Sequence, residues 1–112
     1  MSKKKLILEV IRITREHFDH PSKFGINEKG ECRYINDHKQ RCAVGHYAHT
    51  QGVSDEVLES WNNMHWKQIY REKVLAELPD QFWYDLQVAH DTCKRDPQQL
   101  NSHLDLVEEP WK

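Results

Sequence analysis

The sequence predicts an all-α protein, a compact bundle of five to six helices interrupted by one long irregular loop. Apolar residues recur at the helical spacing of three or four over most of the chain. Serine, aspartate, glycine and proline stand where such helices would begin or end. The chain has 112 residues, the length of one domain. We therefore expect residues 1–112 to form a single helical domain.

The first expected helix covers about residues 4–18. Leu6 and Val10 lie on its apolar face, and His17 continues that face, so we expect this histidine in the core. Pro21 ends the helix, because the residue before a proline avoids the helical conformation.

Residues 22–40 show no helical period and contain glycine, asparagine and aspartate, which favour turns. We expect a long irregular loop there, with room for one short β-hairpin that turns at residues 27–30. Loops of this length in small domains are often functional.

Further helices are expected at about residues 41–51, 54–61, 64–78, 79–94 and 96–107. Gly52 is placed to cap the end of the first of these. Ser54 and Asp96 are placed to cap the beginnings of two others. Pro79 and Pro97 suit a first helical turn.

Gly45 falls inside an expected helix, where glycine costs about 1 kcal/mol relative to alanine. Such a glycine indicates that another backbone or a bulky side chain comes close. The side chains that we expect there are Trp61, Trp66 or Trp83.

The charge balance, the apolar stretches and the cysteines limit the partners and the cellular environment that we expect. Sixteen Lys and Arg face 18 Asp and Glu, so we do not expect a nucleic-acid partner, which would favour clustered basic residues. No apolar stretch approaches the ~18 residues that cross a bilayer. The three cysteines are an odd number, so we do not expect a closed disulfide framework. We expect a cytoplasmic protein without membrane association.

Histidine is the unusual residue of the composition, with eight copies. Protonation of all eight would move the net charge from -2 to +6, so the chain is expected to be sensitive to pH. The same histidines are a stock of metal ligands and acid–base groups.

Cys42, His46 and His49 would share one face of a helix, at spacings of four and three. A thiolate and two imidazoles are suitable zinc ligands, and Cys32 in the preceding loop could complete a tetrahedral site. Alternative fourth ligands lie on a later helix, at His90 and Cys93.

A structural role is the alternative for this cluster. Cys42 would then be a small core residue, the histidines would lie at the surface, and no cofactor would be bound. Cys42 at a helix N-terminus is also a candidate nucleophile, because the helix dipole favours a thiolate. The sequence identifies no base oriented beside it, and we favour a buried thiol.

His90 and Asp91 form an adjacent pair of the kind that metal-dependent phosphohydrolases carry on a helix. His46 or His49, with Asp105, would complete such a site, and its metal ion would generate a hydroxide nucleophile. The alternative is a histidine at the flank of the core beside an exposed aspartate. We favour that alternative, in which the chain is no enzyme.

Tryptophan and tyrosine gather in the C-terminal half of the sequence. Most of them must build the core, but residues 82–84 (FWY) cover most of a helix circumference, so at least one is expected to be exposed. Exposed Trp and Tyr side chains are common anchors of protein interfaces. The residues that we expect to bind a partner are Trp66, Trp83, Tyr84 and Trp111.

Residues 42–45 (CAVG) and 86–91 (LQVAHD) resemble segments of a group of small uncharacterised helical domains found in phages and bacteria. Tyr47 departs from the leucine of that group, and His46 and His49 depart from its small or apolar residues. The resemblance implies a small helical domain, often phage-encoded and without an assigned activity. It also implies that residues 42 and 45 have a packing role.

Small size, the lack of a complete catalytic set and the surplus of aromatic residues predict a non-enzymatic interaction protein. We expect a phage-encoded inhibitor or modulator that binds a host defence or metabolic protein in the host cytoplasm. A zinc-stabilised binding domain and a small metal-dependent phosphohydrolase are the alternatives, and a homodimer is compatible with all three.

Overall fold

The computed structural model describes residues 2–26, 33–93 and 95–112, and within them the chain is all-α. The helices are α1 (Lys3–His17), α2 (Ala43–Thr50), α3 (Asp55–Trp61), α4 (Trp66–Ile69), α5 (Asp80–Thr92) and α6 (Pro97–Glu108). Two short 3-10 turns, η1 (Pro21–Lys23) and η2 (Glu109–Trp111), follow α1 and α6. The predicted fold class is confirmed.

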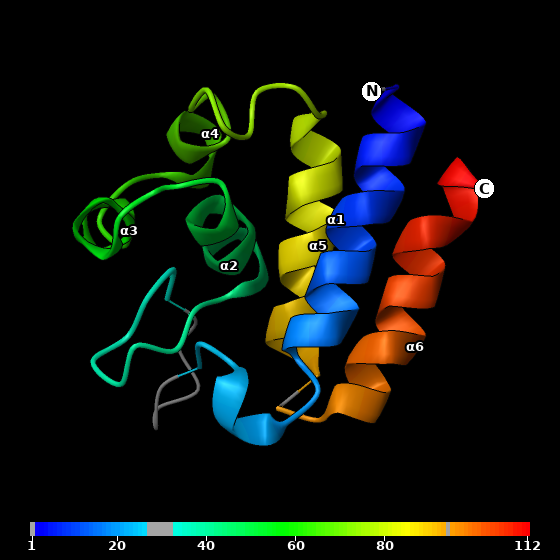
Figure 1. Cartoon of the computed structure of the whole chain (residues 1–112), viewed down its shortest axis with the longest axis horizontal. Coiled ribbons are helices and arrows are strands. Elements are labelled where there is room, and N and C mark those ends of the chain that lie inside the picture. Colours follow the sequence, from blue (N-terminus) through cyan, green and yellow to red (C-terminus); the bar gives the residue numbers. More distant parts are fainter. Residues whose placement is uncertain (1, 27–32, 94) are drawn as a thin grey trace.

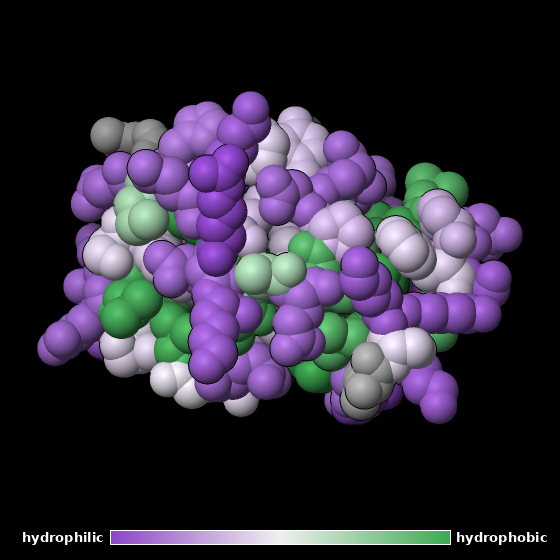
Figure 2. Space-filling model, turned by 90° about the horizontal axis from the view of Figure 1, so that it is seen from above, coloured by the Kyte–Doolittle hydropathy of each residue, from purple (hydrophilic) through white to green (hydrophobic). Residues whose placement is uncertain are grey.

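The three long helices α1, α5 and α6 lie side by side, and the short helices α2, α3 and α4 gather beside them (Figure 1). α6 packs on α1 and α5, and α2 packs on the same two helices. Both termini lie at one end of the molecule. Seen from that end, hydrophilic residues cover most of the surface, and hydrophobic side chains show between them (Figure 2).

The core is built from the helix faces that the periodicity predicts. On α1, Ile7 and Val10 are fully buried, and on α6, Leu100 and Leu104 are fully buried. α5 contributes a stripe that is likewise buried, consisting of Phe82, Leu86, Ala89 and, just after the helix, Cys93.

The predicted helix caps are present. Ser54 accepts a hydrogen bond from the Val57 N–H at 3.3 Å, and Asp96 caps α6 in the same manner. Gly52 follows α2 with a φ of +96°, the left-handed region that favours glycine. Pro79 differs slightly from the prediction, because it is the N-cap of α5 rather than a residue of the first turn.

The prediction of a helix at 64–78 is wrong beyond the first turn. Regular helix ends at Ile69, and irregular turns follow as far as Leu78. The buried residues Ile69, Tyr70, Leu75 and Leu78 explain the difference. At 100° per residue these four would spread over about 240° of a helix. A regular helix could not turn all of them into the core.

The loop before α2 forms isolated bridges rather than strands in its described part. Arg41 bridges Phe24 in parallel and Ile35 antiparallel. The hairpin turn predicted at 27–30 lies outside the described residues.

Two glycines let this loop approach α2. A Cβ on Gly45 would lie 2.2 Å from the Tyr34 carbonyl oxygen, and a Cβ on Gly25 would lie 2.5 Å from the Arg41 carbonyl carbon. The close neighbour predicted for Gly45 is therefore a backbone, and the expectation of a tryptophan there is wrong.

Candidate functional site

Cys42 is the N-cap of α2, and its side chain turns back onto its own helix. The Sγ accepts a hydrogen bond from the Gly45 N–H at 3.3 Å, and the residue is 1% exposed. Burial raises the pKa of the Cys42 thiol to about 12, which outweighs the effect of the helix N-terminus. Cys42 is therefore a buried thiol with little thiolate character, which does not suit a nucleophile.

The histidines predicted to join Cys42 in a zinc site have other partners. His46 stacks on His17 of α1, with ring centroids 3.6 Å apart and an interplanar angle of 11°. His49 is half exposed, and its Nδ1 lies 3.7 Å from the Asp55 carboxylate. Helical spacing does not apply to Cys42, because its backbone is extended at the N-cap.

The predicted zinc site is not assembled in the described part of the chain. Among residues 2–26, 33–93 and 95–112, no three His, Cys, Asp or Glu side chains are arranged to hold a metal ion. Cys32, the predicted fourth ligand, lies outside these residues.

His90, the centre of the predicted phosphohydrolase site, is fully buried in the core. Its Nε2 accepts a hydrogen bond from the Gly25 N–H at 3.3 Å, and its Nδ1 donates to the Asp91 carboxylate at 2.9 Å. Both ring nitrogens are thus engaged within the protein. Asp105, the aspartate predicted to complete this site, instead pairs with Arg15 of α1 at 2.6 Å. The predicted hydrolase site is not formed from these residues.

The bonds of His90 and Asp91 extend to the beginning of α2. Gln87 donates from Nε2 to the Asp91 carboxylate at 2.7 Å, and its Oε1 accepts from the Val44 N–H at 3.2 Å. Gln87 thereby satisfies one of the N–H groups that the first turn of a helix leaves free. The segments 42–45 and 86–91 meet at this junction, where their polar side chains join α2, α5 and the Gly25 backbone.

The four predicted interface aromatics fall into different environments. Trp83 is 1% exposed and donates from Nε1 to the Leu75 carbonyl at 2.7 Å, so its prediction as a surface anchor is wrong. Trp66 and Trp111 are half-buried and pack against the edge of the core. Tyr84 is 44% exposed, which confirms that one residue of 82–84 reaches the surface. Its ring lies 5.5 Å from that of Trp66.

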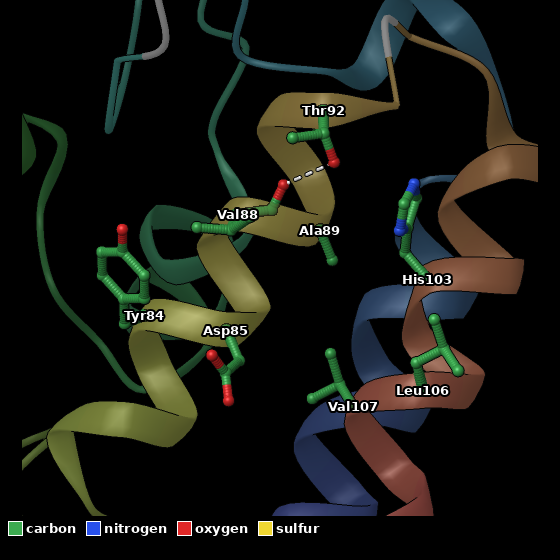
Figure 3. Close-up of a pocket in the computed structure, with 8 residues that line it drawn as sticks. All are labelled: Tyr84, Asp85, Val88, Ala89, Thr92, His103, Leu106 and Val107. Carbon is green, nitrogen blue, oxygen red and sulfur yellow. Dashed lines mark hydrogen bonds between the residues drawn. The ribbon is translucent and has the colours of Figure 1, made fainter.

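Tyr84 lies at a groove between α5 and α6, drawn in Figure 3. The groove has a volume of about 380 Å³. Ala89 of α5 and Val107 of α6 point into the space between the two helices, while Tyr84 and Val88 lie on the outer side of α5. The complete lining is Tyr84, Asp85, Val88, Ala89, Thr92, His103, Leu106 and Val107.

Exposed apolar side chains are concentrated at this groove. The described part of the chain exposes four large hydrophobic side chains, and three of them line the groove: Leu106, Tyr84 and Val88. Leu106 is the most exposed of the four, at 72%. Exposed apolar side chains that gather at one groove mark interaction sites more often than scattered single residues do.

The two helices that form the groove are acidic. Neither 80–92 nor 97–108 contains any of the chain's 16 Lys and Arg. The same helices carry carboxylates at Asp80, Asp85, Asp91, Asp105 and Glu108. Asp85 lies in the lining of the groove itself and accepts a hydrogen bond from Gln81 at 2.8 Å.

Sequence reasoning identified Tyr84 but missed Val88 and Leu106. The signal was present in the helical phase, because Leu106 lies about 200° from Leu104. An apolar residue on the face opposite the core stripe points away from the core and is left exposed. The meeting of α5 and α6, which turns two such residues into one groove, is a tertiary feature.

No helix in the described part of the chain has the length and apolar character needed to span a bilayer. The chain matches no protein-family model, no curated protein and no solved structure.

Proposed function

We propose that the chain is a small non-enzymatic interaction protein that binds one helix of a partner in the groove between α5 and α6. The observation that carries the proposal is the exposure of Tyr84, Val88 and Leu106 at one groove. An amphipathic helix laid into such a groove would bury these side chains, which is a common mode of peptide recognition.

The charge of α5 and α6 supports a basic partner. Asp105 and Glu108 of these helices are paired with Arg15 and Lys112. Asp85, however, lies in the lining of the groove, so a bound helix with lysines or arginines beside its apolar face would find complementary charge there. A second copy of the chain would bring the same acidic face to the groove. Like charges would then meet, so a homodimer through this face is disfavoured.

The resemblance of segments 42–45 and 86–91 to phage and bacterial domains supports a more specific form of the proposal. In that form the partner is a host protein of the bacterial cytoplasm, and the chain inhibits or modulates it by occupying its basic helix. The groove supports binding of an amphipathic helix, and the resemblance supports a phage-encoded protein with a bacterial partner.

A pair of designed peptides tests the groove directly. One is an amphipathic helix with leucines on one face and flanking lysines, and the other replaces each lysine by glutamate. Titrated into isotope-labelled protein, the lysine peptide is expected to shift the backbone amide signals of 84–92 and 103–107. The glutamate peptide is expected to bind far more weakly.

Variants then locate the binding site. Leu106→Ala is expected to weaken binding of the lysine peptide about tenfold, or about 1.4 kcal/mol. Val57→Ala is the matched control, because Val57 is 42% exposed on α3 and does not line the groove. Equal effects of the two variants, or no binding of the lysine peptide at millimolar concentration, would contradict the proposal. A dimer in sedimentation that Leu106→Ala dissociates would replace the partner helix with a second copy.

A further inference from the structure

Two histidines from different helices form a stacked pair at the contact of α1 and α2. His17 is the last residue of α1, and His46 lies in the middle of α2. Their ring centroids are 3.6 Å apart, and both rings are half-buried. The Nδ1 of His46 is buried and has no hydrogen-bond partner in the described part of the chain. An extra proton on that nitrogen would therefore lack an acceptor.

The charged groups around the pair are cations and carboxylates. The carboxylates already form ion pairs with the cations. From η1, Lys23 pairs with Asp19 at 2.9 Å. Before α2, Arg41 pairs with Asp55 of α3 at 2.6 Å, and His49 of α2 faces the same carboxylate. These cations would oppose a positive charge on the pair, and the carboxylates are engaged with them.

We propose that the stacked His17–His46 pair is an acid-sensitive contact, neutral when α1 packs on α2, whose protonation separates the end of α1 from α2. Two imidazolium rings at stacking distance repel each other, and a half-buried charge without an acceptor loses its hydration. The inference is independent of the groove and of its partner.

The direction of the pH dependence follows from the pKa values. Burial lowers the pKa of His17 to about 4 and that of His46 to about 3, and the nearby cations, Lys23 and Arg41 among them, add to the effect. Both histidines start from an ordinary value of 6.5 when the contact is open. The open state therefore takes up protons first as the pH falls below about 6.5. The packed state loses stability from there down to about pH 3, where its own rings become protonated.

Opening would expose a neighbouring aromatic cluster. Phe18, which follows His17, packs on Phe24 and on His90, with ring centroids 5.0 Å away in each case. The contacts of α6 with α1 and α5 lie outside this cluster and are expected to persist longer. The structure therefore points to a local opening of the α1–α2 contact before the whole bundle unfolds.

Histidine titration by NMR tests the pair in the unmodified protein. Between pH 7.5 and 5, the ring signals of His17 and His46 are expected to remain those of neutral imidazoles. Amide exchange is expected to accelerate first at residues 14–18 and 42–50, with α5 and α6 still protected. If both rings titrate near pH 6.5 while exchange at these residues is unchanged, the inference is overturned.

Variants give a second measurement. When the pH is lowered from 7 to 5, each histidine that stays neutral in the packed state is expected to raise the unfolding equilibrium constant about 20-fold. The double variant His17→Phe/His46→Phe keeps two stacked rings but loses that part of the pH dependence in urea unfolding. His38→Phe is the control, because His38 is exposed in the loop. A double variant with the full pH dependence of the natural chain would contradict the inference. If the double variant does not fold, the NMR titration decides.

Discussion

At the scale of single residues, Gly45 is fixed by its surroundings rather than by helix propensity. Alanine would favour the helix by about 1 kcal/mol, but the added Cβ would lie 2.2 Å from the Tyr34 carbonyl oxygen. The carbonyl belongs to the backbone of the loop and cannot move without displacing Tyr34, whose N–H is bonded to Asn62 at 2.7 Å.

We expect Gly45→Ala to lower the free energy of unfolding by about 1–3 kcal/mol, because overpacking outweighs propensity. Urea denaturation measures the loss. Gly52→Ala is the comparison, since a Cβ there meets no atom within 4 Å and is strained only by a φ of +96°. A Gly45→Ala protein as stable as the natural one would refute the close approach of the loop.

The residue scale also shows where sequence reasoning fails. Cys42, His46 and His49 have the spacing of a shared helix face, but the first of them precedes the helix. Trp83 and Tyr84 are neighbours in the sequence, and the first is buried while the second is exposed. The start of α2 separates Cys42 from the two histidines, and the phase of α5 against the core separates Trp83 from Tyr84.

At the scale of elements, the long helices were predictable and the short ones less so. α1, α5 and α6 are each at least three turns long and carry an apolar stripe, which fixes both the element and its buried face. The region after α4 has apolar residues at a mixed spacing, and there the demands of the core decide the backbone. The junction of α2 with α5 could not be predicted, because Gln87 and Val44 are 43 residues apart.

Gln87→Met should lower the free energy of unfolding by about 1–3 kcal/mol. The change keeps a long side chain but leaves the Val44 N–H without its partner, and it removes one donor from the Asp91 carboxylate. Gln81→Met is the matched control on the same helix, because Gln81 is exposed and its side chain donates to the exposed Asp85. Thermal unfolding followed by circular dichroism compares the two. Similar melting temperatures would show that the junction contributes little.

At the scale of the whole molecule, charge is distributed unevenly. All 16 Lys and Arg lie outside α5 and α6, although Arg15 and Lys112 pair with Asp105 and Glu108 of α6. The balanced net charge of -2 conceals this arrangement. The groove is likewise not visible in the sequence, since neither helix alone shows that its exposed apolar residues will meet those of the other.

We expect the affinity for the lysine peptide to fall at least roughly threefold between 0.05 M and 0.5 M NaCl, because salt screens the acidic helices. The fractional loss caused by Leu106→Ala should be the same at both salt concentrations, since it reflects apolar burial. Isothermal titration calorimetry measures both effects. An affinity that does not change with salt would mean that the carboxylates take no part in recognition.

The capping of α2 by Gln87 has a consequence for the order of folding. α2 has eight residues, too few to persist alone in water, and one of its first N–H groups depends on a side chain of α5. Gly25 of the loop and Gly45 of α2 must also reach their close contacts before α2 is enclosed. α2 is therefore completed late, after the chain has closed a long-range loop, and its formation reports on the assembly of the rest rather than initiating it.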